Sequence, residues 1–185
     1  MDAGIARDEE ASLRRVIEEA LEISDAFVIT GGVSVGEFDL TRRVLDRLGF
    51  EALFWKVAVK PGKPLLFGTL KGKPVFGLPG NPLSALICAE EFIRPALEKM
   101  SGAEGRPPSY HLRGTVVNDY PKPAGRRQYV FCRVKRKDGE FLLEVIRPQG
   151  SAMIGMASRA EAIALAPIGV SRLVPGMELD FRWMK

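Results

Sequence analysis

A glycine-rich loop that ends in a carboxylate carries the first chemistry suggested by this sequence. The loop reads Gly-Gly-Val-Ser-Val-Gly-Glu-Phe-Asp over residues 31–39. An apolar run at residues 26–30 precedes it and a helical pattern begins at Leu40, so the loop is expected to join a buried strand to a helix. The backbone N–H groups of such a loop can approach a phosphate, and the helix N-terminus adds positive potential. Asp39 could cap the helix, or hold a cation beside that phosphate.

A second segment supplies cations. Residues 56–64 read Lys-Val-Ala-Val-Lys-Pro-Gly-Lys-Pro. If the run is an extended strand, Lys56 and Lys60 lie on one face of it, because side chains alternate along a strand. Two lysines on one face of a buried strand need an anion beside them, whereas a solvated sheet edge needs none, and both interpretations stay open. The turn at residues 61–64 is expected to position these groups rather than to react.

A third segment is a second strand-to-helix turn, Gly-Leu-Pro-Gly-Asn-Pro-Leu-Ser-Ala over residues 77–85. Asn81 is expected to be the N-cap of the next helix and Pro82 its first residue, where a missing N–H costs little. Together with the first loop, this turn is expected to bring two helix N-termini to one crevice at the carboxyl ends of the strands. Ser84 could contact a phosphate there, or cap the helix.

Together, the three segments resemble the molybdopterin molybdenumtransferase family, which includes the gephyrin E domain. The resemblance runs from about Asp8 to the C-terminus. The related molybdopterin adenylyltransferases share a Gly-Gly loop and a Pro-Gly turn, but they normally read GGTG at the first and lack the KPGKP segment. Family members are usually much longer than this chain. The resemblance therefore implies missing N-terminal domains, supplied by a longer chain or by a partner chain.

The resemblance also implies a reaction and its cofactors. In the family, molybdate displaces AMP from adenylylated molybdopterin, and carboxylates hold Mg²⁺. It implies catalytic roles for Asp39, Lys56 and Lys60, and metal-binding roles for Asp39 and Asp8, although a helix cap explains Asp8 equally well. The residues that it implies for binding molybdopterin are Gly31, Gly32, Ser34, Val35, Gly36, Pro61, Gly62, Lys63, Pro79, Gly80, Asn81, Ser84, Arg133 and Ser151.

One position departs from the family pattern. The family often has an arginine two residues after the aromatic residue of a G-R-x-x-aromatic strand, and here Phe131 occupies that place. Arg133 is two residues further along, on the same strand face, and could substitute. Ser151 belongs to a Gly-Ser turn that resembles the family turn whose serine faces the active site.

The hydrophobic periods predict the elements that position these groups. Helices are expected over 8–24, 40–48 and 81–100, with strands over 26–30, 52–59, 65–69 and 74–77, which form a domain over residues 1–102. Residues 103–109 have the composition of a linker. Five further strands are expected over 111–117, 128–136, 140–146, 161–166 and 177–183. The predicted fold is thus an α/β three-layer molybdopterin-binding-like domain, truncated at its N-terminus, followed by a small all-β barrel-like domain over 110–185.

Composition excludes several other classes. Hydrophobic residues make up 46% of the 185 residues and charged residues 27%, which is ordinary for a globular protein. The single histidine and two cysteines without metal-ligand spacing argue against a zinc site, and the cysteines suit the cytoplasm. No apolar run suggests a membrane span. The basic C-terminal half lacks the interleaved aromatic residues of a nucleic-acid platform, so we expect no nucleic-acid partner.

Three functions remain open at this point. The first is molybdate insertion by part of a larger or multi-chain enzyme. The second is a fragment that binds molybdopterin or its adenylate without catalysis, and the third is an adenylyltransferase-like domain. Whichever holds, strand 26–30 is expected to be an apolar sheet edge without a guarding lysine or proline, which predicts a homo-oligomer such as a dimer.

Overall fold

The computed structural model describes residues 1–32, 40–103 and 109–184. The chain forms two compact units. The first contains Met1–Val57 and Lys63–Asn81, and the second contains Ala58–Gly62 and Pro82–Lys185. Each unit is built around its own hydrophobic core.

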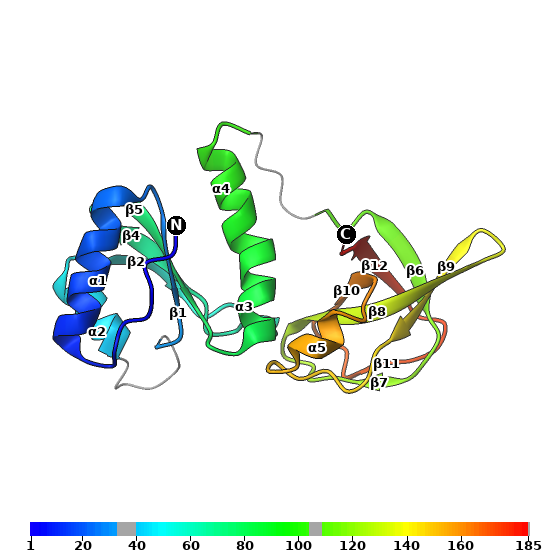
Figure 1. The fold of residues 1–185 in the computed structure, drawn as a ribbon. Helices are drawn as coiled ribbons and strands as arrows, with labels where there is room; N and C mark the ends of the chain where they lie inside the picture. The colour runs from blue at the N-terminus through cyan, green and yellow to red at the C-terminus, as the bar shows by residue number, and fades with distance from the viewer. Residues whose placement is uncertain (33–39, 104–108, 185) are drawn as a thin grey trace. The chain divides into compact units, whose positions relative to one another are not determined.

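The first unit is a four-stranded sheet with two helices on one face (Figure 1). Its helices are α1 (Glu10–Ile23) and α2 (Leu40–Arg47). Its strands are β1 (Phe27–Thr30), β2 (Glu51–Trp55), β4 (Leu66–Leu70) and β5 (Lys73–Leu78). The strand order is β1-β5-β4-β2, with β1 parallel to β5 and the other two pairings antiparallel.

Helix spacing explains how this core forms. Helix α1 buries an apolar stripe that consists of Leu13, Ile17, Ala20 and Leu21. The stripe joins one cluster with residues of α2 and of the sheet, including Val44, Leu45, Leu66 and Val75. The expected cap is wrong in detail, because Glu9 rather than Asp8 is the N-cap residue and it makes no side-chain capping bond.

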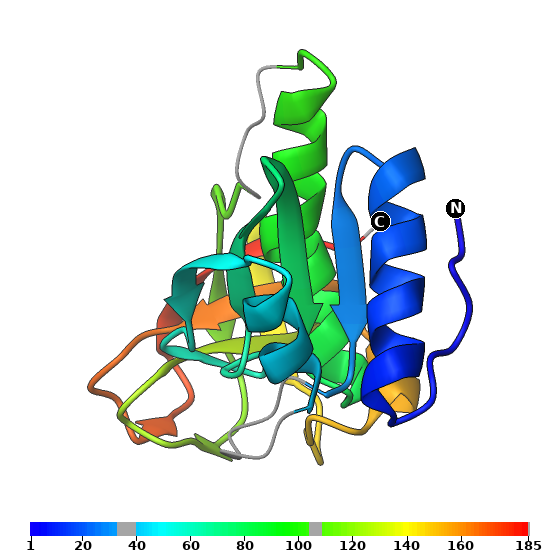
Figure 2. The same ribbon diagram turned by 90° about the vertical axis from the view of Figure 1, so that its left-hand side faces the viewer.

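Strand β1 lies at the edge of the sheet in the described part of the chain, as the sequence predicts (Figure 2). It pairs with β5 on one side, and 42% of the surface of its Val28 is exposed to solvent. An apolar edge with unpaired backbone groups tends to add another strand. The 185-residue chain should therefore self-associate, which size-exclusion chromatography with light scattering will detect. A stable monomer at high concentration, with rapid amide exchange at Phe27–Ile29, would contradict this.

The predicted strand over 52–59 is wrong in one respect. The structure has two strands there, β2 in the first unit and the two-residue β3 (Val59–Lys60) in the second. Lys56 interrupts them with a φ of 72°, a left-handed conformation that no strand accepts. Lys56 and Lys60 therefore do not share one face of one strand.

The second unit is a small β-barrel that carries a segmented helix (Figure 1). The segmented helix consists of α3 (Pro82–Cys88), the π-helix η1 (Ala89–Ile93) and α4 (Arg94–Met100), and a separate short helix, α5 (Ile154–Ala157), follows later in the chain. In addition to β3, the strands of this unit are β6 (Leu112–Val116), β7 (Tyr120–Pro121), β8 (Arg127–Lys137), β9 (Glu140–Val145), β10 (Ala162–Ala166), β11 (Arg172–Leu173) and β12 (Glu178–Trp183). The order β10-β12-β6-β9-β8 closes into a five-stranded barrel because β8 also pairs with β10. The predicted class, an α/β domain followed by a small barrel, is confirmed.

The helix expected over 81–100 is present, but it is not regular throughout. The wider π turn immediately precedes Pro95, which has no N–H to donate to the carbonyl of Glu91. Leu83 and Ile87 of α3 pack with Tyr129 and Phe131 of β8. The compact units therefore divide between Asn81 and Pro82, whereas the sequence pattern places the boundary in the linker at 103–109. Periodicity identifies a helix, but it does not tell which core the helix joins.

Candidate functional site

In the first unit, the start of the glycine loop lies against the second strand-to-helix turn. The Gly31 N–H donates to the Leu78 carbonyl at 3.1 Å, and a Cβ on Gly80 would lie 3.6 Å from the Gly31 Cα. Gly31 and Gly32 have φ of 81° and 64°, which few other residues adopt. The two loops that the sequence singled out are thus neighbours. Pro79 is buried, whereas Gly80 and Asn81 are exposed. The predicted site residues Ser34, Val35, Gly36 and Asp39 lie outside the described residues.

The loop after β2 holds Lys56 and Lys63. The Lys56 N–H donates to the Leu65 carbonyl at 2.9 Å, and the Val57 N–H donates to the Lys63 carbonyl at 2.9 Å. Both lysines are exposed. The Lys56 ammonium lies 4.0 Å from the centre of the Trp55 ring, a cation–π contact that orients it. These lysines belong to the first unit, whereas Lys60 belongs to the second.

In the second unit, β3 places Lys60 beside the barrel. Lys60 pairs with Gln128 of β8 in parallel register. The turn that follows is fixed by Gly62, which has a φ of 108°. A Cβ at this position would lie 2.9 Å from the Cys88 Sγ, so glycine alone fits. Pro61 and Gly62 are buried, which agrees with a positioning role for this turn.

The N-terminus of α3 meets the Gly-Ser turn in the same unit. The Leu83 N–H donates to the Ser151 carbonyl at 3.1 Å. Ser84 is 3% exposed, and its carbonyl lies 3.9 Å from the position that a Cβ on Gly62 would take. The Pro-Gly turn at 61–62, the first turn of α3 and the Ser151 turn are therefore adjacent. This brings together three segments that the sequence analysis singled out.

Sequence reasoning missed the residue that holds the Ser151 turn. The Gln149 side chain accepts a hydrogen bond from the Phe131 N–H at 3.1 Å and donates to the Phe131 carbonyl at 2.9 Å. It also donates to the Ile146 carbonyl at 2.8 Å. Gln149 therefore ties the turn to the edge of β8. A glutamine in a loop gives no signal of this kind, because its partners are backbone groups distant in sequence.

The strand that departs from the family pattern is now located. Phe131 is fully buried in the cluster that covers the outside of β8. Arg133 follows on the same face, is exposed and pairs in register with Glu144 of β9. The alternation that the sequence predicts is therefore present, and the role of Arg133 as a substitute stays a prediction.

The described residues do not form the expected magnesium site. Asp8 is exposed next to the start of α1, and Asp39 lies outside the described residues. Among the residues that the structure describes, no group of three or more His, Cys, Asp or Glu side chains is placed to hold a metal ion. The assignment of Asp8 and Asp39 to Mg²⁺ therefore stays a prediction without structural support.

Two protein families match this chain, one in each half. Residues 1–99 match the family described as "Probable molybdopterin binding domain". Residues 113–182 match the "MoeA C-terminal region (domain IV)". The chain belongs to the molybdopterin-binding domain family. The resemblance drawn from the three sequence segments is thereby confirmed.

Curated relatives of this chain include molybdopterin molybdenumtransferases. A molybdopterin molybdenumtransferase from Haemophilus influenzae is 36% identical over 129 residues, which are 70% of this chain and 32% of that protein. One from Bacillus subtilis is 30% identical over 153 residues, 83% of this chain and 35% of that protein. The chain thus spans about a third of the length of these relatives.

Solved structures agree with the fold of this family member. A molybdopterin biosynthesis moea protein from Pyrococcus horikosii matches with a TM-score of 0.75 at 32% identity, over 99% of this chain and 43% of that chain. A molybdenum cofactor biosynthesis protein from Pyrococcus furiosus matches with a TM-score of 0.67 at 24% identity, over 95% of this chain and 55% of that chain, which supports the fold alone. In the described part of the chain, no helix combines the length and apolar character that a membrane span requires.

Proposed function

We propose that this chain acts in molybdenum cofactor biosynthesis, in the step that inserts molybdate into adenylylated molybdopterin and releases AMP. The observation that carries the proposal is the cluster in the second unit. There the Pro61-Gly62 turn of the KPGKP segment, the N-terminus of α3 and the Ser151 turn are adjacent. The KPGKP segment separates the molybdenumtransferase pattern from the adenylyltransferase pattern. The matches to both family regions, in this order along the chain, support the same step.

The chemistry asks the protein to hold polyanions. Molybdopterin adenylate carries phosphates, and molybdate, the second substrate, is an oxyanion. In the first unit, the Gly32 backbone N–H and the Lys56 ammonium are donors of the kind that such groups require, and in the second unit the Lys60 ammonium is another. In this proposal Lys60 faces the anion and Gly62 fixes its place. No step is assigned to Mg²⁺, because Asp8 is the one of its two predicted ligands that lies among the described residues.

The complete enzyme is expected to contain more than these residues. Because the chain spans 32% of the Haemophilus influenzae relative, we propose that further domains, in the same or another chain, take part. We also propose a homodimer that works in the cytoplasm on small-molecule substrates, without a nucleic-acid or membrane partner. The exposed edge of β1 supports self-association.

A fragment that binds molybdopterin adenylate without turnover is the alternative. The two proposals differ in the release of AMP. Single-turnover release of AMP from adenylylated molybdopterin should be followed by chromatography after molybdate is added. The 185-residue chain should release little AMP, and the native protein isolated from its source should release it in a molybdate-dependent way.

Two results would change this proposal. If the native protein binds the adenylate and releases no AMP with molybdate, the non-catalytic alternative holds. If the 185-residue chain alone releases AMP as fast as the native protein, further domains are not needed. The mass of the native protein should be determined in the same preparation, because it shows whether the chain works as part of something larger.

A further inference from the structure

A buried lysine that the sequence analysis did not single out lies in the barrel unit. Lys122 follows β7 and is 5% exposed. Its ammonium donates to the carbonyls of Pro167 and Val170 at 2.8 and 2.7 Å. An ammonium has three N–H donors, and among the described residues the third has no acceptor. Among the described residues, no carboxylate forms an ion pair with Lys122. Burial disfavours the charged form of Lys122 and lowers its pKa, and an anion beside the ammonium would offset this cost.

The register of β3 directs Lys60 to the same region. Val59 packs with Tyr129 and Phe131 on the outer face of β8. Side chains alternate along a strand, so Lys60 lies on the opposite face, together with its register partner Gln128. On β8 this face lines the barrel interior, where Val130 and Cys132 contribute to the core, and the half-buried Lys60 extends the same face from the neighbouring β3. The proximity of Lys60 also contributes, after burial, to lowering the pKa of Lys122.

Gln128 adds an unsatisfied acceptor at this position. It is 2% exposed, and its Nε2 donates to the Tyr120 hydroxyl at 2.8 Å. Its Oε1 is buried without a hydrogen-bond partner. A buried amide oxygen without a donor is costly, and natural proteins rarely leave one. The oxygen therefore calls for a ligand that carries a hydrogen-bond donor.

Nearby acidic groups do not neutralise these lysines. Asp119, close to Lys122 in sequence, accepts a hydrogen bond from Arg172 at 2.9 Å, and this bond, followed by the charges of Arg172 and Arg147, lowers its pKa. Arg147 lies over the Tyr120 ring, and Arg126 donates to the Val59 carbonyl. The described groups around Lys60 and Lys122 are thus mainly cationic or neutral.

We propose that Lys60, Lys122 and Gln128 form an inner subsite for a protonated oxyanion of the phosphomonoester class. Two ammonium groups meet the negative oxygens, and the Gln128 carbonyl accepts the proton that such a group carries near its pKa of about 6. A phosphate ester of the substrate is the natural occupant, so this inference rests on the proposed function. Lys122 and Gln128 are the new residues. Lys122 is expected to hold the anion that Lys60 attracts.

The test is calorimetric titration of the 185-residue chain with inorganic phosphate and with sulfate at pH 6 and low ionic strength. Phosphate should bind to one saturable site, at least tenfold more tightly than sulfate, which carries no proton to donate. Lys122→Met should weaken phosphate binding at least tenfold. Gln128→Met should bring the phosphate and sulfate affinities within about threefold. Lys135→Met, an exposed lysine of β8, is the matched control and should bind as the parent does.

A second readout keeps the proposal testable if Lys122→Met does not fold. Lysine acetylation of the unmodified chain, read by mass spectrometry, should be at least fivefold slower at Lys60 with phosphate present and unchanged at Lys135. Equal binding of sulfate and phosphate would overturn the role of Gln128, and absent phosphate binding without protection of Lys60 would overturn the subsite. Phosphate binding by a protein that never binds molybdopterin would leave the subsite standing and remove the proposed function. Molybdopterin binding that is unaffected in Lys122→Met would leave the proposed function standing and remove the subsite.

Discussion

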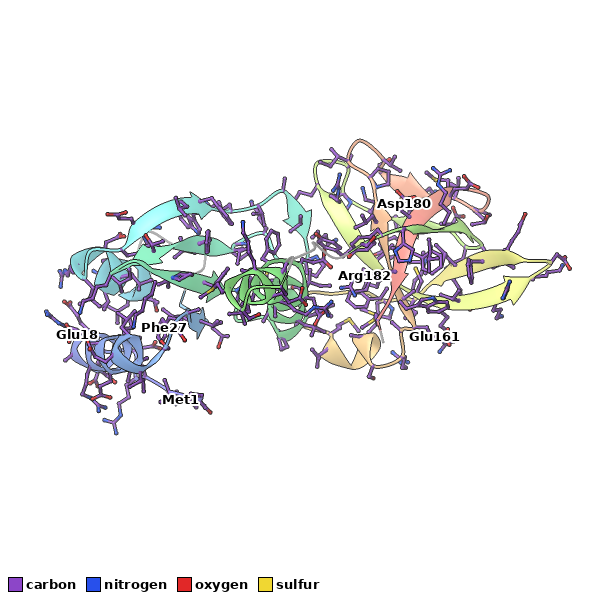
Figure 3. All side chains as sticks on the ribbon, turned by 90° about the horizontal axis from the view of Figure 1, so that it is seen from above. Met1, Glu18, Phe27, Glu161, Asp180 and Arg182 are labelled. Carbon is purple, nitrogen blue, oxygen red and sulfur yellow. The ribbon has the colours of Figure 1, made fainter. Side chains whose placement is uncertain are left out.

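Replacing Arg182 with leucine should lower the free energy of unfolding by about 3–5 kcal/mol, because it leaves a buried carboxylate without its cation. The Arg182 guanidinium donates to the Glu91 Oε1 at 3.0 Å, and the Tyr110 hydroxyl donates to the same oxygen at 2.7 Å. The side chains of Arg182 and Glu91 are 12% and 7% exposed. Arg182, labelled in Figure 3, belongs to β12 of the barrel. Glu91 belongs to the π turn of the helix.

The charge states in this network follow from the surroundings. Burial by itself lowers the pKa of Arg182, but hydrogen bonds and charge interactions with Tyr110 and Glu91 outweigh it and raise the pKa. Burial and then Glu91 raise the pKa of Tyr110, which stays a neutral donor. The Arg182 side chain also lies over the Tyr110 ring, 5.6 Å from its centre. The network therefore fixes the helix that begins beside the Ser151 turn on the barrel.

Arg113→Leu is the matched control for this prediction. Arg113 pairs with Glu178 and Asp180, yet its side chain is 72% exposed. Exposed pairs contribute little, so this variant should lose at most about 1 kcal/mol. Urea unfolding followed by circular dichroism measures both. If the free energy of unfolding falls by the same small amount in both variants, the Glu91–Arg182 pair does not hold the helix on the barrel.

The stability of the chain should also fall steeply above pH 9. Burial raises the pKa of the Cys88 thiol to about 12 and that of the Cys132 thiol to about 12. In the unfolded chain, thiols ionise from about pH 8.5. Between these values the folded state holds protons that the unfolded state has released, so stability is complete below pH 8.5 and is lost as the pH rises towards 12. Each thiol should contribute about 1.4 kcal/mol per pH unit in this window.

Urea unfolding at pH 8, 9.5 and 11 measures the effect. Burial likewise raises the pKa of Tyr110 and Tyr129, which should steepen the loss above about pH 10, where unfolded tyrosines ionise. Cys132→Ala should reduce the slope between pH 9 and 10 by about half, since one of two thiols is removed. An unfolding free energy that stays constant from pH 8 to 11 would contradict the burial of these groups.

The sequence predicted the elements whose hydrophobic period is regular. The apolar stripe of α1 indicated the α/β domain, and the alternation along β8 indicated the β domain. The interruption of the predicted strand at Lys56 was missed because a lysine in the sequence does not indicate a positive φ. The packing of Leu83 and Ile87 onto the barrel was missed because an apolar helix face does not indicate which core the helix packs against.

The candidate site divides in the same way. The resemblance to the family selected the Gly62 turn and the Ser151 turn, and the structure places both beside the start of α3. Gln149 and Lys122 were not found, because their roles come from backbone carbonyls and burial that only the folded chain brings together. The glycine loop beyond Gly32 and the carboxylate Asp39 rest on the sequence alone.

Binding of adenylylated molybdopterin to this chain is the property on which the proposed function depends, and isothermal titration calorimetry measures it directly. We predict one saturable site on the 185-residue chain, weakened by added salt, as screening requires. Lys60→Ala should weaken binding at least tenfold, whereas Lys99→Ala, an exposed lysine of α4, should leave it unchanged. A folded chain that shows no saturable binding, or that binds equally well with Lys60 replaced, would contradict the function proposed here.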